Sequence, residues 1–129
     1  MVTPGYLAYH PDPKKPDLAL PAGSCDSHCH VFGPAAQFPY SPESTYVPVD
    51  AGCDTLFSRH RFLGIDRAVI VQASCHGSNN DAMLNALNAG GDSYRGVAVV
   101  DREISPAELE TMHAAGVRGV RFNLSLIHI

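Results

Sequence analysis

The chain has 129 residues, of which 45% are hydrophobic and 17% are charged, and its formal net charge is −4. This balance is typical of one globular domain and argues against a disordered chain. Lysine and arginine form no cluster beyond Lys14-Lys15, and no apolar stretch approaches the ~20 residues of a membrane span. We therefore expect neither nucleic acid nor a membrane as a partner. The four cysteines lack a zinc-ribbon or disulfide-framework spacing, which predicts reduced thiols and a cytoplasmic location.

The first 22 residues are rich in proline. Half of the ten prolines of the chain lie here, at positions 4, 11, 13, 16 and 21. Proline has no amide hydrogen and fixes φ, so this segment cannot form a regular helix or a central strand. We expect an extended arm that lies over the domain.

From residue 24 onward, apolar stretches alternate with amphipathic ones. In chain order the predicted elements are a strand at 24–31, a helix at 53–64, a strand at 66–73, a helix at 79–89, a strand at 94–100, a helix at 105–116 and a strand at 117–122. The second and third strands are continuous apolar runs, which predicts burial on both faces. Ser105, Pro106 and Glu108 form the pattern of a capping box at the start of the third helix.

Strands that alternate with helices imply right-handed crossovers and a parallel α/β sheet. Four strands and three helices fit either a small open sheet or half of an eight-stranded barrel, which typically needs ~250 residues. A half barrel would expose the edges of its first and fourth strands. Periodicity alone does not decide between these two architectures.

Two histidines, His28 and His30, lie one residue apart at the end of the first predicted strand. The period of two places both side chains on one face, and the carboxyl ends of parallel strands carry the functional site in such folds. Three interpretations stay open at this point: a metal-binding pair, a substrate-binding pair, and two strand-end histidines with structural partners only. Cys29, between them, should point away into the core.

Several segments resemble, in the same order, the amino-terminal half of the 2-pyrone-4,6-dicarboxylate lactonases of the amidohydrolase superfamily. They are CDSHCHVFGP, FPYSPESTYVPVDA, LGIDRAVIVQASCHGSNNDAML, YRGVAVVD and AGVRGVRFN, and they span about residues 20–123. The resemblance implies a (β/α)8 TIM-type barrel, of which this chain carries the first half. It also implies a hydrolase that opens the cyclic ester of a pyrone dicarboxylate in the catabolism of aromatic compounds.

The same resemblance implies roles for individual residues. His28 and His30 would be catalytic and polarise the lactone carbonyl without a required metal. The expected substrate-binding residues are Tyr46, Ser74, His76 and Arg121. The Arg121 guanidinium would pair with a carboxylate of the small-molecule dicarboxylate lactone. The alternative is a divalent metal such as zinc on the histidine pair, as in a metal-dependent amidohydrolase or decarboxylase.

These residues also have plain structural interpretations. Tyr46 could be a packed loop aromatic, and Ser74 and His76 could be turn or cap residues. For arginine the structural alternative is a surface ion pair, a role that we assign to Arg118 instead. Asp26 could orient a histidine or simply end the strand, and the sequence leaves this open.

We expect three segments: an arm at residues 1–22, a partial barrel domain at 23–123 and a non-native tail at 124–129. The tail, LSLIHI, matches one reading frame of a common transposase sequencing adapter. The family's general base, a carboxylate at the end of the eighth strand, has no counterpart in this chain. On this interpretation the chain as given is an inactive fragment that self-associates or aggregates through its open edges. The sequence does not set the oligomeric state of the intact protein.

Overall fold

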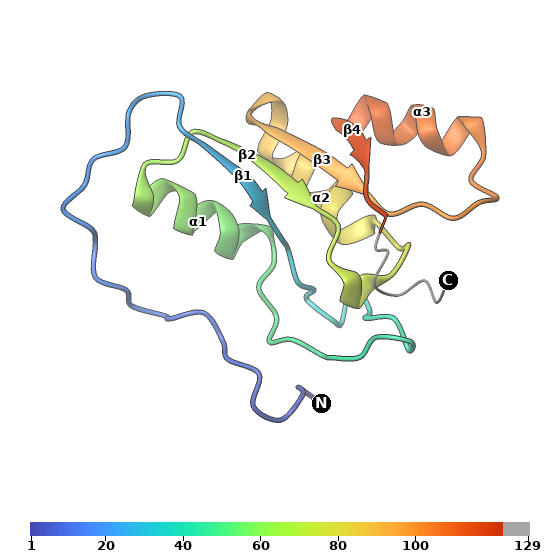
Figure 1. Cartoon of the computed structure of the whole chain (residues 1–129), viewed down its shortest axis with the longest axis horizontal. Coiled ribbons are helices and arrows are strands. Elements are labelled where there is room, and N and C mark those ends of the chain that lie inside the picture. The colour runs from blue at the N-terminus through green and yellow to red at the C-terminus, as the bar shows by residue number, and fades with distance from the viewer. Residues whose placement is uncertain (123–129) are drawn as a thin grey trace.

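The computed structural model describes residues 1–122, and the tail predicted at 124–129 lies outside the described residues. The predicted alternation of four strands and three helices is confirmed (Figure 1). The elements are β1 (Cys25–Cys29), α1 (Cys53–Leu63), β2 (Arg67–Val71), α2 (Asp81–Gly90), β3 (Tyr94–Ala98), α3 (Pro106–Ala115) and β4 (Val117–Val120), with short 3₁₀ turns η1 (Ser74–His76) and η2 (Gly91–Ser93). None of the helices among these residues has the length and apolar character needed to cross a membrane.

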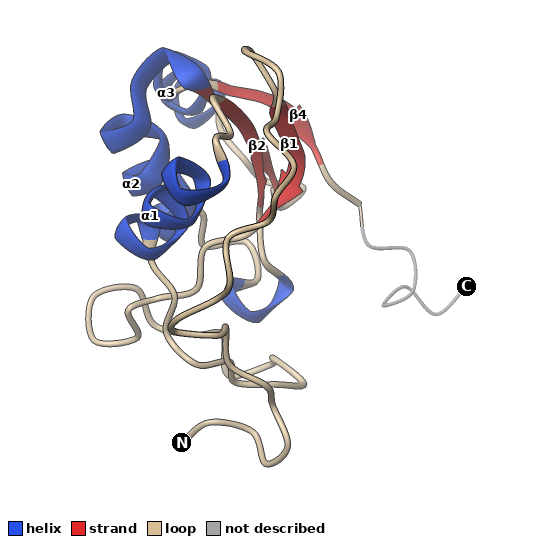
Figure 2. Cartoon of the chain, turned by 90° about the vertical axis from the view of Figure 1, so that its left-hand side faces the viewer, coloured by secondary structure: helices blue, strands red, loops and turns tan. Residues whose placement is uncertain are grey.

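The strands form one parallel sheet in the order β1-β2-β3-β4. Figure 2 shows the three helices on one side of this sheet. A doubly wound open sheet reverses its strand order and carries helices on both faces, whereas a barrel keeps sequential order with all helices outside. The architecture therefore favours part of a barrel, a choice that the sequence periodicity left open.

The hydrophobic core lies between the sheet and the helix layer. Its most buried members are Ile70, Met83, Ala86, Leu87 and Ala98. Burial alternates along β3, so the side chains that face away from the helices are only half-buried. The prediction of burial on both faces is wrong for β3, because no described helix covers the second face of the sheet.

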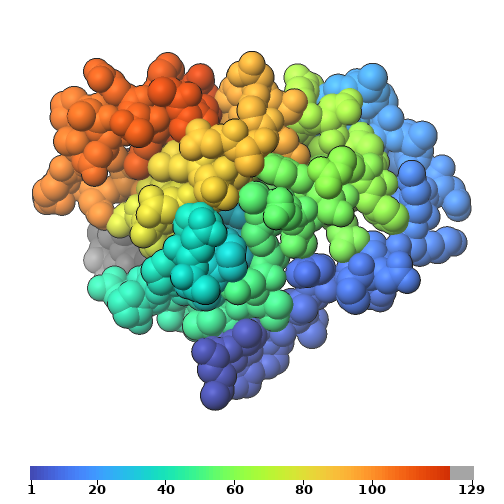
Figure 3. Space-filling model, turned by 180° about the vertical axis from the view of Figure 1, so that it is seen from behind, coloured from blue at the N-terminus to red at the C-terminus, as the bar shows by residue number. Residues whose placement is uncertain are grey.

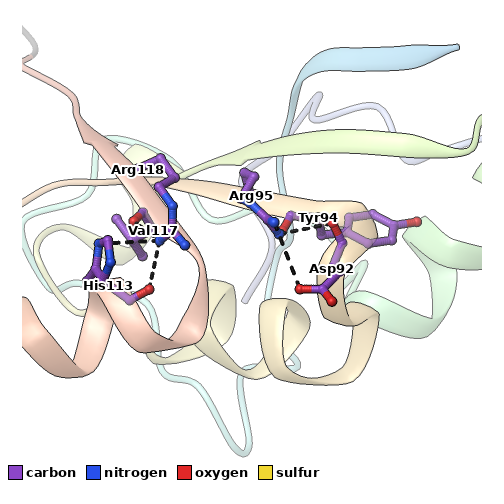
Figure 4. A network of polar contacts seen from close by, with 6 residues as sticks. All are labelled: Asp92, Tyr94, Arg95, His113, Val117 and Arg118. Carbon is purple, nitrogen blue, oxygen red and sulfur yellow. Dashed lines mark hydrogen bonds and ion pairs between the residues drawn. The ribbon is translucent and has the colours of Figure 1, made fainter. Parts of the chain in front are cut away.

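Arginines at the amino ends of β3 and β4 bind backbone carbonyls (Figure 4). The guanidinium of Arg118 donates to the carbonyl oxygens of His113 and Val117, each at 2.7 Å. The predicted surface ion pair of Arg118 is therefore wrong for the described part of the chain. Its guanidinium instead satisfies the carbonyl of Val117 in β4 and that of His113 in the last turn of α3, where a cation also complements the helix dipole.

The amino-terminal 22 residues contain no helix or strand and run along the side of the molecule beside α1 (Figure 3). Arg59 of α1 donates to the carbonyl of His10 at 2.9 Å. Near the start of the arm, the backbone N–H of Thr3 donates to the carbonyl of Val47 at 2.9 Å. The N–H of Val47 in turn donates to the Thr3 hydroxyl at 2.7 Å. The first residues of the arm thus lie against the loop that follows β1.

Two glycines in the strands, Gly96 and Gly119, differ in how much space surrounds the position where a side chain would begin. A methyl group added at Gly96 would lie 2.7 Å from Cδ1 of Leu87 and 3.2 Å from Cγ2 of Val117. At Gly119 the nearest atom would be Cγ2 of Val97, 3.5 Å away. We expect Gly96→Ala to lower the free energy of unfolding by about 1–3 kcal/mol through overpacking. Gly119→Ala, the matched control, should leave it unchanged or raise it slightly. Urea denaturation checks both, and equal effects would contradict this packing.

Candidate functional site

The first strand carries a bulge that decides which of its side chains face the helices. Asp26 pairs with Ala68 and Cys29 pairs with Ile70, so β1 uses one more residue than β2 over this stretch. The extra residue brings Asp26 and Cys29 onto the same face, although their spacing is odd. Cys29 packs against the core, as predicted.

Asp26 holds this bulge through both of its carboxylate oxygens. Oδ1 accepts a hydrogen bond from the backbone N–H of His28 at 3.1 Å, and Oδ2 lies 3.3 Å from Nε2 of His60 on α1. His60 is buried, and its Nδ1 lies 3.0 Å from the Tyr94 hydroxyl on β3. Asp26 therefore contacts the ring of one histidine, His60, and the backbone N–H of another, His28, and it does more than end the strand.

His28 and His30 lie together at the carboxyl end of β1, with ring centroids 5.1 Å apart and rings nearly perpendicular. Nδ1 of His30 lies 2.8 Å from the carbonyl oxygen of Val71. A carbonyl only accepts, so Nδ1 carries the proton and the neutral ring presents an unprotonated Nε2. Burial lowers the pKa of His30, and His28 and Arg121 lower it further against the opposing effect of the Val71 carbonyl. The neutral form is favoured.

Arg121 follows β4 and reaches the same edge of the sheet as the two histidines. Its backbone N–H donates to Ala98 at 2.7 Å and so continues the pairing of β4 with β3. Its Nη1 donates to the carbonyl of Gln72 at 3.1 Å, just beyond β2. Within residues 1–122 no carboxylate pairs with it. A guanidinium held by one carbonyl keeps further N–H donors for an anionic ligand.

Tyr46 and Ser74 come from different loops and contact each other. The Tyr46 hydroxyl lies 3.2 Å from Oγ of Ser74. Tyr6 of the arm stacks on Tyr46, with centroids 5.9 Å apart and rings within 3° of parallel. Burial raises the pKa of Tyr46, so its hydroxyl stays protonated at neutral pH. Sequence reasoning missed Tyr6, because no pattern links the arm to this loop.

His76 is buried, and the protein uses both of its ring nitrogens. Nε2 accepts from the N–H of Gly33 at 3.1 Å, and Nδ1 donates to the carbonyl of Pro39 at 3.2 Å. These bonds fasten the loop after β1 to the turn η1. The predicted contact of His76 with substrate would require one of them to break, so the geometry favours a structural role.

Two buried amides hold the turn after β2, and sequence reasoning missed both. Nε2 of Gln72 donates to the carbonyls of Gly77 and Asn79 at 3.0 and 2.8 Å. Asn80 bonds both the N–H and the carbonyl of Val99, beyond β3. The sequence did offer one indication: Gln72 directly follows an apolar strand. A side-chain amide buried at that position must find hydrogen-bond partners.

The donor set of the histidine pair also fits two ligands of a divalent metal. A ring whose Nδ1–H is held by a carbonyl, with Nε2 unprotonated, has the arrangement of a metal-bound histidine. A hydrolytic zinc site takes about three protein ligands. Among the described residues no cysteine, histidine or carboxylate completes a group of three with His28 and His30.

The burial of His76 predicts a pH dependence of stability. Burial lowers its pKa, against the opposing effects of the Pro39 carbonyl and Asp50, so between the folded and unfolded pKa values the unfolded chain binds more protons. Stability should therefore fall as the pH drops through about 6.5, the ordinary histidine value. His76→Gln should make the free energy of unfolding less dependent on pH in this range. The matched control is His10→Gln on the exposed arm, and an unchanged slope in His76→Gln would contradict the assignment.

Solved structures share this fold. The chain is similar to the crystal structure of a probable 2-pyrone-4,6-dicarboxylic acid hydrolase from Acinetobacter baumannii with citric acid bound. The TM-score is 0.74 at 34% identity, over 82% of this chain and 39% of that one. A putative 2-pyrone-4,6-dicarboxylic acid hydrolase from Pseudomonas putida gives a TM-score of 0.60 at 33% identity, over 78% and 37%. The predicted partial (β/α)8 barrel is confirmed.

Curated relatives agree with the structures. Over 121 residues the chain is 53% identical to a 2-pyrone-4,6-dicarboxylate hydrolase of Comamonas testosteroni, covering 94% of this chain and 40% of the relative. A 4-sulfomuconolactone hydrolase of Rhizobium radiobacter is 36% identical, over 86% of this chain and 37% of its own. The chain thus spans about two fifths of the length of these relatives. The profile of the amidohydrolase family matches residues 25–128, and the chain therefore belongs to the amidohydrolase family.

Proposed function

We propose that a barrel built on this chain is a hydrolase that opens the cyclic ester of a pyrone dicarboxylate or a closely related anionic lactone. The observation that carries the proposal is the convergence of His28, His30 and Arg121 on one edge of the sheet. The names of two relatives support it, because both substrates are lactones with anionic substituents. An aromatic-catabolism role follows from this substrate class.

Arg121 and the Tyr46–Ser74 pair supply the groups that an anionic lactone needs for binding. The planar guanidinium matches a carboxylate in two parallel hydrogen bonds. The two hydroxyls, 3.2 Å apart, can donate to a second anionic group. Binding at two separated points fixes the ring and presents its ester carbonyl to the histidines.

His28 would polarise the ester carbonyl of the lactone by donating a hydrogen bond to its oxygen. A hydrogen bond to the carbonyl oxygen stabilises the negative charge that develops when water adds to the ester carbon and the ring C–O bond breaks. His28 is exposed and can donate a ring N–H. His30 would have to be an imidazolium to donate from Nε2, which its lowered pKa opposes. From the sequence we expected both histidines to polarise the carbonyl. In this proposal only His28 donates a hydrogen bond to the carbonyl oxygen, and the unprotonated Nε2 of His30 can accept a hydrogen bond beside it.

A second candidate, a metal-dependent hydrolase or decarboxylase on the same barrel, is favoured by one observation. The unprotonated Nε2 of His30 is suited to a divalent ion. His28 and His30 would then hold the ion, which would act as a Lewis acid toward the substrate carbonyl. The remaining ligands would come from strands outside the described residues.

On its own, we propose, the 129-residue chain is not catalytic and associates with itself. Large apolar side chains are exposed beside the edge of β4 that no described strand pairs: Leu109 is 44% exposed, Val120 42% and Phe122 74%. An unpaired strand edge with apolar neighbours is a template for association. We expect sedimentation velocity to show mass rising with concentration and Phe122→Ser to reduce this. A monomer at all concentrations would contradict the proposal.

Lactone hydrolysis can be tested in a fusion barrel, defined here as residues 1–122 joined to the corresponding remainder of the Comamonas hydrolase. We expect the fusion barrel to consume pyrone dicarboxylate, followed by its ultraviolet absorbance. His28→Ala should lower kcat/KM by about 10²–10³-fold through loss of the carbonyl contact. Arg121→Lys should mainly raise KM, because a bidentate contact is lost. Thr111→Ala on the exposed face of α3 is the control. A folded fusion barrel inactive on all anionic lactones, beside an active Comamonas hydrolase, would refute the proposal.

Chelation separates the two mechanisms. Under the first proposal, activity of the fusion barrel should survive prolonged treatment with a chelator, because His28 acts through hydrogen bonding. Loss of activity that zinc or manganese restores would instead establish the metal-dependent candidate. Metal content measured before and after treatment serves as the control that chelation was complete.

A further inference from the structure

A second group of metal-ligating side chains lies on the helix side of the sheet, apart from His28 and His30. Asp26, Cys29 and His60 each offer one ligand atom, and these three atoms all lie within 4.8 Å of one another. We propose that they bind one thiophilic divalent ion, such as zinc, between β1 and α1. The β1 bulge creates the site, because it brings Asp26 and Cys29 to the same face.

The distances suit tetrahedral coordination. Ligand atoms about 2.0–2.3 Å from a tetrahedral ion lie about 3.3–3.8 Å apart. Nε2 of His60 and Oδ2 of Asp26 already lie at 3.3 Å. Sγ of Cys29 makes one long contact, 3.5 Å to the carbonyl of Val69, and needs to move by at most about 1 Å.

His60 is held in the orientation that a metal ligand requires. Its Nδ1 is bonded to the Tyr94 hydroxyl at 3.0 Å, and the two rings stack with centroids 5.8 Å apart. Metal-bound histidines characteristically have such a partner on the second nitrogen. Before binding, Nε2–H donates to Asp26 and Nδ1 accepts from Tyr94. On binding, the ring proton moves to Nδ1 and donates to the Tyr94 oxygen, while Nε2 takes the ion.

The charges balance when a divalent ion is present. The ion displaces the thiol proton of Cys29 to solvent, so one thiolate, one carboxylate and the divalent cation sum to zero. Without the ion, burial, aided by Asp26, raises the pKa of Cys29 to about 12 and keeps the thiol neutral. The Asp26 side chain is 31% exposed, which gives the ion a route from solvent and a position for water as fourth ligand.

Such an ion would fasten the strand that carries the histidine pair. It would link β1 to α1 while the second oxygen of Asp26 keeps its bond to the N–H of His28. Because the ion binds only the folded arrangement, it stabilises the protein by mass action. The role is structural and independent of the proposed hydrolysis.

Cobalt titration of the purified 129-residue chain and of the fusion barrel tests the site, since cobalt bound by a thiolate absorbs in the near ultraviolet. We expect one cobalt per chain, with this absorption, displaced by zinc. Cys29→Ser should abolish the band, and His60→Gln should weaken binding. Tyr94→Phe should keep the band but weaken binding by about 10–100-fold, because the partner of the ligand is lost.

The controls are Cys25→Ser, an exposed cysteine on the same strand, and His10→Gln, a histidine on the exposed arm, both of which should bind as the unaltered protein does. Circular dichroism establishes that each variant is folded. Absence of a thiolate band in the folded chain and the folded fusion barrel would overturn the proposal. So would a band that survives Cys29→Ser, or one lost in Cys25→Ser or His10→Gln.

Discussion

The carboxylate of Asp26, with the bulge that it holds in β1, determines where the histidine pair points. In a regular strand residues 26, 28 and 30 would share one face, and a carboxylate would lie among the histidines. The extra residue turns Asp26 to the helix side, where His60 receives it, and leaves His28 and His30 on the other side. The same carboxylate bonds the N–H of His28. One side chain thus separates the layer that stabilises the fold from the face that carries the histidine pair of the proposed site.

The rest of the site depends on the ends of parallel strands meeting at one edge. Three of the four strands have a local feature that places residues at this edge: the bulge in β1, the buried amide of Gln72 after β2, and the continued backbone pairing of Arg121 after β4. Two contacts hold the loop after β1 in place. His76 accepts a hydrogen bond from the N–H of Gly33 in this loop, and Tyr6 of the arm stacks on Tyr46. The groups of the proposed binding site are thereby held in place by hydrogen bonds and stacking, which catalysis by orientation would require.

Periodicity predicted the order of elements most directly for β2, α2 and β3, which bury apolar residues on the side that faces the core. The capping box of Ser105 and Glu108 marks the start of α3 and is present as predicted. A barrel and an open sheet share the alternation of strands and helices. They are distinguished by the structure, in which the strand order is sequential and the helices lie on one side of the sheet. A bulge has no pattern in sequence, and therefore the position of Asp26 could not be predicted. The role of His76 was inferred from the family resemblance, and that of Arg118 from its residue type. Their partners are backbone carbonyls and amides, which only the folded chain brings within reach.

A crystal structure of the fusion barrel with an unreactive dicarboxylate analogue of the lactone would test the central claim most directly. We predict a carboxylate of the analogue on the guanidinium of Arg121 and the carbonyl oxygen of the analogue within hydrogen-bond distance of His28. Asp26 should remain on the helix side, bonded to the N–H of His28. An analogue bound away from both residues, or an Asp26 carboxylate turned toward the histidine pair, would contradict the proposed site.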